Sequence, residues 1–153
     1  MKRVFLMGLL FLLSSCALFK IEVPPESYSL ETAIRILENR EYTLMDLKNV
    51  DQYAEVTMPG KVAVFETKDG VIFFYAYKGE DAKKIWKTIR KKTGFFSVRS
   101  ILDLPNMGKF STILEGKKIV AWWKKSWLFI VEGKDGVEDF VKHIHEVYEV
   151  LRG

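Results

Sequence analysis

Two histidines and one cysteine are the side chains of this sequence best suited to metal binding or nucleophilic chemistry. His143 and His145 lie two residues apart in a stretch with helical periodicity, where successive residues turn by about 100°. Their rings should therefore point about 200° apart, on different flanks of the apolar stripe. They cannot hold one metal ion together, and the HExxH spacing is absent. We expect two surface histidines, with no metal site and no cofactor.

A catalytic nucleophile is also hard to place in this sequence. There is no GxSxG or SxxK motif and no P-loop or dinucleotide fingerprint, because Gly116, Gly133 and Gly136 are isolated turn glycines. A serine could still meet one histidine and a carboxylate in space, so a hydrolase stays open as an alternative. The residues favour a non-enzymatic protein without catalytic residues.

The lone Cys16 ends a segment that has the layout of a secretory signal. Lys2 and Arg3 form a short positive region, and residues 4–13 form an apolar run that is too short to span a membrane. Small residues then precede the cysteine. An exported chain with one cysteine has no partner for an internal disulfide, so this pattern predicts another role for the thiol.

The four residues Leu13-Ser14-Ser15-Cys16 resemble the lipobox of bacterial lipoproteins. The resemblance implies cleavage before Cys16, a diacylglyceryl group on its thiol and often acylation of the new amine. Two or more acyl chains give stable anchoring. We expect residues 1–15 to be a signal peptide and the protein to lie in the cell envelope, lipid-anchored to a membrane on its extracytoplasmic side. An ordinary signal peptide or a buried N-terminal helix is the alternative.

Composition places limits on the rest of the chain. Removal of residues 1–15 would leave 138 of the 153 residues and, without Lys2 and Arg3, a formal net charge of +2 in place of +4. The basic character of the full sequence is therefore no sign of a nucleic-acid partner, and the expected export argues against one. The length suits one domain. Gln occurs once and Asn three times against abundant Lys and Glu, a bias typical of thermophile proteins.

Residues 16–27 contain Pro24-Pro25 and no period, which predicts a lipidated tether. Residues 28–153 are expected to form a single α+β domain, in which an antiparallel sheet packs against amphipathic helices. Helical periodicity predicts helices over residues 29–39, 80–92 and 135–151. Turn residues between apolar runs predict two hairpins, 62–67 with 71–77 and 119–123 with 127–131. Further strands are expected over residues 53–58, 95–102 and 109–115, with 103–108 as a loop and 41–50 left ambiguous.

Five cations share one face of the expected helix over residues 80–92. They are Lys83, Lys84, Lys87, Arg90 and Lys91. On a domain held near a membrane, this candidate basic face could touch anionic headgroups or an acidic partner. The alternative is an ordinary solvated helix face.

Three tryptophans, Trp122, Trp123 and Trp127, gather in the second hairpin. Adjacent residues of a strand point to opposite faces of the sheet, so Trp122 and Trp123 should face opposite ways. We therefore expect at least one of the three outside the helix-covered core. It would be buried under a loop, or it would be an exposed anchor for a ligand, a partner or the membrane interface. This is the candidate binding surface.

Two segments carry a resemblance to a known fold. The hairpin followed by Gly-Glu-Asp-Ala and a helix, and the aromatic hairpin that leads into an amphipathic C-terminal helix, resemble the PsbP-like α+β fold and a small family of uncharacterised lipoproteins of thermophilic bacteria. The resemblance covers about residues 28–152. It implies a binding or assembly role, as in the photosystem extrinsic subunits and a Ran-binding factor, and no catalytic residues.

Together these patterns favour a membrane-anchored, non-enzymatic binding or assembly module whose partner is an unknown envelope protein or component. The alternative is a small-ligand-binding protein, or a hydrolase, with a pocket between the sheet and the helices.

Overall fold

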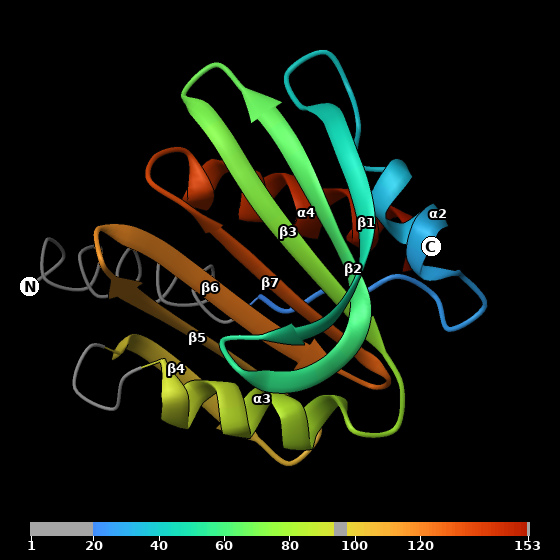
Figure 1. The fold of residues 1–153 in the computed structure, drawn as a ribbon. Coiled ribbons are helices and arrows are strands. Elements are labelled where there is room, and N and C mark those ends of the chain that lie inside the picture. Colours follow the sequence, from blue (N-terminus) through green and yellow to red (C-terminus); the bar gives the residue numbers. More distant parts are fainter. Residues whose placement is uncertain (1–19, 94–97, 153) are drawn as a thin grey trace, which may run out of the picture.

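The computed structural model describes residues 20–93 and 98–152 (Figure 1), so the predicted signal peptide and Cys16 lie outside the described residues. In this part of the chain, one antiparallel sheet contains seven strands in the order β1-β2-β3-β7-β6-β5-β4. The strands are β1 (Thr43–Tyr53), β2 (Val56–Thr67), β3 (Gly70–Lys78), β4 (Val98–Leu104), β5 (Met107–Leu114), β6 (Lys117–Lys124) and β7 (Trp127–Gly133). The helices are α2 (Leu30–Arg35), α3 (Ala82–Lys92) and α4 (Val137–Arg152). The predicted α+β class, with an antiparallel sheet and a C-terminal helix, is confirmed.

The sheet consists of two meanders that meet at its centre. Strands β1, β2 and β3 form one, strands β4 to β7 form the other, and β3 pairs with β7 to join them. Helix α3 lies in the connection from β3 to the edge strand β4 (Figure 1). Both predicted hairpins are confirmed, because Thr67 pairs with Gly70 and Lys124 pairs with Trp127 across two-residue turns.

Two predicted segments are wrong in detail. Residues 53–58 are not one strand, since Ala54 and Glu55 adopt positive φ angles of 48° and 65° and reverse the chain between β1 and β2. The residues of type I′ turns are usually Asn and Gly, so this turn carries no sequence signal. The ambiguous stretch before it belongs to β1. The expected loop 103–108 is also shorter, because Leu104 pairs with Met107.

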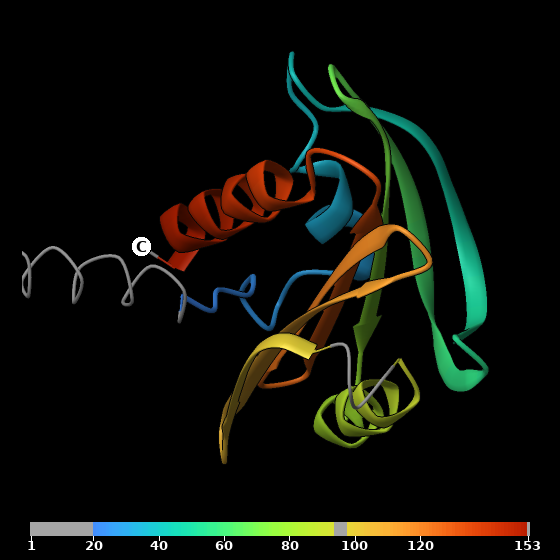
Figure 2. The ribbon, with the colours of Figure 1, turned by 90° about the vertical axis from the view of Figure 1, so that its left-hand side faces the viewer.

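Helices cover both faces of the sheet (Figure 2). Helices α2 and α4 pack on one face, and the predicted stripe of α4 is buried there around Phe140, Ile144 and Tyr148. Helix α3 packs on the opposite face through Trp86 and its neighbours. Helix α2 is shorter than predicted, ending at Arg35, although Ser29 caps it as expected by accepting from the amide of Thr32.

The N-terminal part of the described chain belongs to the domain. Ile21 and Val23 lie in the core on the α4 face of the sheet, and the carbonyl of Glu22 accepts a hydrogen bond from the buried indole of Trp122. The predicted tether over residues 16–27 is therefore wrong for residues 20–27. Without a period of its own, this segment gave no sign that it fills a gap between β6 and α4. Between residues 20 and 152, the described helices include none long and apolar enough to cross a bilayer.

Candidate functional site

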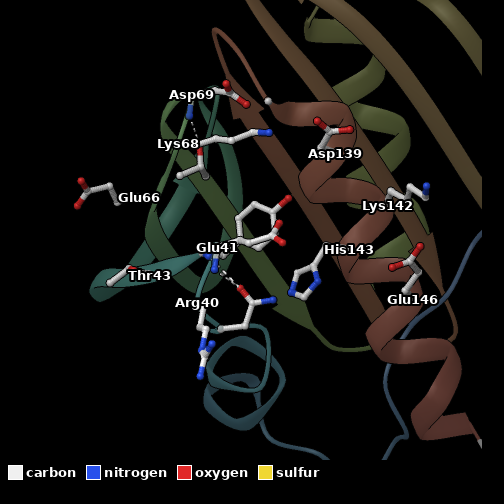
Figure 3. Close-up of a pocket in the computed structure, with 14 residues that line it drawn as sticks. Arg40, Glu41, Thr43, Glu66, Lys68, Asp69, Asp139, Lys142, His143 and Glu146 are labelled. Carbon is white, nitrogen blue, oxygen red and sulfur yellow. Dashed lines mark hydrogen bonds between the residues drawn. The ribbon is translucent and has the colours of Figure 1, made fainter.

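An open cleft of about 870 Å³ lies between the loop before β1, the turn between β2 and β3, and one flank of α4 (Figure 3). Eight of its lining residues carry charged side chains, and we call it the acidic cleft. They are the carboxylates Glu41, Glu66, Asp69, Asp139 and Glu146 and the cations Arg40, Lys68 and Lys142. The remaining lining residues include Tyr42 and His143.

A side chain fixes the loop on one side of this cleft. The side-chain oxygen of Asn39 accepts hydrogen bonds from the amides of Glu41 at 2.8 Å and Tyr42 at 2.9 Å. Such an Asx turn replaces backbone hydrogen bonds and holds the chain in a tight bend. The bend sets the carboxylate of Glu41 opposite α4, which contributes Asp139, Lys142 and Glu146 (Figure 3).

The charges of the acidic cleft are left unbalanced. Among the described residues, none of its eight charged side chains forms an ion pair. The excess of carboxylates affects the phenol of Tyr42. Its pKa is raised by burial and then by Glu41 and Asp139, with smaller contributions from Asp69 and Glu146. The cleft therefore presents negative charge to whatever enters it.

His143 is held by contacts inside the domain. Its Nε2 donates to the carbonyl of Leu37 at 2.8 Å, and its ring stacks on Tyr42 with centroids 4.7 Å apart. These contacts join α4 to the chain after α2. His143 is half-buried, so it lies at the edge of the cleft as part of its wall (Figure 3).

His145 contradicts the prediction of two surface histidines, because its side chain is buried. Its Nδ1 donates to the carbonyl of Val141 at 2.9 Å, its Nε2 lies 3.2 Å from the ammonium of Lys109, and its ring packs on Trp122. Burial, and then the charge of Lys109, lower its pKa to about 3. The imidazole is therefore neutral, and Nε2 accepts from Lys109. The prediction failed because β5 and β6 cover a position that lies at the flank of the apolar stripe.

The two histidines have different partners on different elements. Among the described residues, no group of three or more His, Cys, Asp or Glu side chains is placed to hold a metal ion.

The tryptophan cluster is not a binding surface. Trp122, Trp123 and Trp127 are 0%, 5% and 0% exposed. The expectation that Trp122 and Trp123 face opposite ways is confirmed, since Trp122 packs on the α4 face and Trp123 on the α3 face. The expectation of a tryptophan outside the helix-covered core was wrong because helices cover both faces of the sheet. The side chains of β6 can therefore be buried on both sides of the strand.

Two of the five cations in the predicted basic face have partners inside the domain. The ammonium of Lys83 donates to the carbonyl of Pro105 at 3.1 Å. The guanidinium of Arg90 pairs with Asp103 at 2.8 Å and lies over the ring of Trp86. Both therefore fasten α3 to the β4–β5 hairpin. Lys84, Lys87 and Lys91 form no ion pair with any residue that the structure describes.

Comparison with known proteins gives two matches. A family model described as "Protein of unknown function (DUF3242)" matches residues 25–151. A crystal structure from Thermotoga maritima, described as a GTP binding regulator, is 63% identical in sequence with a TM-score of 0.80. That match covers 84% of this chain and 93% of the other. No curated protein matched the chain.

Proposed function

The chain belongs to the DUF3242 family of proteins of unknown function, and we propose that it is a non-enzymatic binding module of the cell envelope, anchored to a membrane by lipid on Cys16. The observation that carries the binding role is the acidic cleft, whose eight charged side chains form no ion pair among the described residues. Carboxylates outnumber cations in the cleft, and such an excess of negative charge favours a positively charged ligand.

The chemistry of the cleft suits a cationic group. Five carboxylates face three cations, and Asp139 and Glu146 lie on the same flank of a rigid helix. A basic segment of an envelope protein could place an ammonium or guanidinium between α4 and Glu41. The hydrogen bond from His143 to Leu37 and its stacking on Tyr42 support a structural role for this ring in place of a catalytic one.

The packing of the N-terminal segment bears on how such an anchored domain would lie. Residues 17–19 separate Cys16 from Lys20, where the described chain begins. The four steps from Cys16 to Lys20 span at most about 14 Å. Lipid on Cys16 would therefore hold the domain against the headgroups.

Helix α3, with Lys84, Lys87 and Lys91, lies on the opposite face of the sheet from the N-terminal segment. This position favours an acidic protein over the bilayer as the partner of these cations.

Crosslinking in the native host tests the binding role. The double variant Asp139→Asn/Glu146→Gln removes two carboxylates of the cleft, and Asp51→Asn/Glu80→Gln is the matched control because these two side chains are exposed and lie outside it. We expect the cleft variant to lose a crosslinked partner that the wild type and the control retain. A crosslinking pattern that is the same in all three proteins would count against the acidic cleft as the binding site.

Mass spectrometry of the mature N-terminus tests the anchor. We expect an acylated Cys16 as the first residue, and a Cys16→Ser variant that moves from the membrane fraction to the soluble fraction. A native protein that keeps Met1 and stays soluble would rule the anchor out.

A second candidate function comes from the Thermotoga maritima structure, which is described as a GTP binding regulator and is 63% identical to this chain. This chain would then also be a GTP binding regulator, although its sequence contains no P-loop. Equilibrium dialysis of the purified protein against GTP, with ATP as the control nucleotide, tests direct binding. Saturable binding of GTP alone would favour this function, and equal retention of both nucleotides at background level would contradict it.

A further inference from the structure

A second cavity, of about 570 Å³, lies on the other flank of α4, between that helix and strands β4, β5 and β6. Asp139, Lys142 and Glu146 line both this cavity and the acidic cleft, so they form the ridge between the two. The β-sheet side is different in character. It contributes Lys109 from β5 and the hydroxyls of Ser100 and Ser111.

Lys109 is a largely buried cation whose contacts are all neutral. Its ammonium donates to the carbonyl of Lys20 at 3.1 Å and to Nε2 of His145 at 3.2 Å. It also lies 5.8 Å from the centroid of the Trp122 ring. Within the described residues it has no ion pair. A buried ammonium without a counter-charge is destabilising.

The groups around Lys109 do not neutralise the charge of its ammonium. His145 is neutral, so it accepts a hydrogen bond without supplying negative charge. Two other lysines at the cavity are already neutralised, Lys20 by Glu149 and Lys118 by Glu138. Burial lowers the pKa of Lys109 to about 8, in line with an ammonium that lacks a carboxylate partner.

The two hydroxyls complete a set of donors. Ser100 Oγ and Ser111 Oγ lie 2.8 Å apart, so one donates to the other. The accepting hydroxyl keeps its own proton for a further acceptor. Lys142 adds a second cation from the ridge, where it lies beside the carboxylates Asp139 and Glu146. An anion with several oxygen acceptors satisfies an ammonium and a hydroxyl together, as a phosphate group does.

We propose that this cavity binds an oxyanion of the phosphate class, with Lys109 as its charged ligand and Ser100 and Ser111 as its hydrogen-bonding ligands. The oxyanion comes either from a free phosphate or from the headgroup of a phospholipid. The lipid source rests on the proposed anchor at Cys16, since Lys20, which lines the cavity, follows that cysteine by four positions. The free source does not depend on the anchor.

Titration of the purified full-length chain with inorganic phosphate, in a non-ionic detergent, tests the site. The affinity is measured by calorimetry, with sodium chloride at the same ionic strength as the reference. Lys109→Met keeps the aliphatic stem and removes the charge, and Lys117→Met is the matched control because Lys117 is exposed on β6. We expect Lys109→Met to raise the Kd at least roughly tenfold, because a charged hydrogen bond is lost, and the control to leave it unchanged.

Two further variants protect this test against a folding defect. Ser111→Ala removes one hydroxyl and should weaken phosphate binding several-fold, whereas Lys109→Arg keeps the charge and should retain most of it. Absence of phosphate and vesicle binding in the wild type, or equal binding in wild type, Lys109→Met and Lys117→Met, would overturn the proposal.

Vesicles distinguish the two sources. Phosphatidylglycerol and phosphatidylcholine vesicles are mixed with the Cys16→Ser variant, so that membrane binding cannot come from the acyl chains. Retention on phosphatidylglycerol vesicles that is lost in Cys16→Ser/Lys109→Met would identify a headgroup. Binding of free phosphate without vesicle retention would identify a soluble ligand. If the Cys16→Ser variant still binds phosphate, the site does not depend on the proposed anchor. This result would hold whether or not the native protein is lipidated.

Discussion

The indole nitrogen of Trp122 on β6 donates a hydrogen bond of 3.1 Å to the backbone carbonyl of Glu22, which lies 100 positions earlier in the chain. The bond is buried and joins the first described segment to the centre of the sheet. The carboxylate of Glu22 also pairs with Arg152 at the end of α4. The segment at residues 20–23 is therefore held from two directions, and it lies beside the cavity around Lys109.

Replacement of Trp122 by Phe should remove this bond and leave the carbonyl of Glu22 buried without a donor. We expect the free energy of unfolding to fall by about 1–3 kcal/mol more than in Trp127→Phe. Trp127 is the matched control, because it is equally buried and its indole nitrogen has no hydrogen-bond partner among the described residues. Urea unfolding measures the difference, and equal losses in both variants would show that only ring volume matters.

The buried His145 should make the domain less stable in acid. Its pKa is about 3 in the folded protein and about 6.5 when unfolded. Between these values the unfolded chain binds a proton that the folded chain does not, so stability falls as pH drops below 6.5. Burial is the main cause of the low pKa, followed by the charge of Lys109 and, more weakly, that of Lys20, whereas the backbone of Val141 and of Lys20 acts in the opposite direction. Urea unfolding from pH 7 to pH 5 should show a shallower decline in His145→Gln, and parallel curves would contradict the assignment.

Gly108 on β5 should not tolerate a side chain. A Cβ there would lie 2.7 Å from Nε1 of Trp123 and 2.8 Å from Cη2 of Trp86. Both rings are buried, so neither can move freely away. We expect Gly108→Ala to lower the free energy of unfolding by about 1–3 kcal/mol. In a double-mutant cycle with Trp123→Leu, the loss should be smaller than the sum of the two single losses; additive losses would mean that the clash is relieved elsewhere.

The cations of α3 should differ in their effect on stability. Arg90 is bound to Asp103 and lies over Trp86, whereas Lys87 has no ion pair among the described residues. We expect Arg90→Gln to lower the free energy of unfolding by about 1 kcal/mol, and Lys87→Gln to change it by less than about 0.5 kcal/mol. High salt should reduce the difference between the two variants in thermal unfolding. If the variants lose equal stability, Arg90 does not fasten the β4–β5 hairpin.

Local patterns predicted most of the elements correctly. The Asp-Gly pair between two apolar runs, and the stripe from Val137 to Leu151, report interactions within one hairpin or one helix, and the structure contains both. The turn at Ala54 and Glu55 was not predicted, because neither residue type favours positive φ angles. Here the two residues adopt such angles between the paired strands β1 and β2. The packing of residues 20–27 on the domain was not predicted, because their burial depends on β6 and α4, which follow about 100 residues later in the chain.

The candidate site could not be predicted from sequence patterns either, because its residues come together only through the packing of distant elements. His145 was expected at the surface, and at least one tryptophan was expected outside the helix-covered core, since one element alone does not show what covers its second face. The acidic cleft joins Glu41 to Asp139, and the second cavity joins Lys20, Lys109 and Ser100, from parts of the chain that no periodicity connects.

By itself, the sequence determined the class of the fold, the two hairpins and the amphipathic helices, because these arise from interactions between near neighbours in the chain. Only the tertiary structure decided which aromatic rings are buried and where charges gather without partners. Burial and electrostatic pairing belong to pairs of elements brought together by the packing of helices on both faces of the sheet. Lys109 shows this most clearly, since it becomes a buried ammonium only when Lys20, Trp122 and His145 close around it.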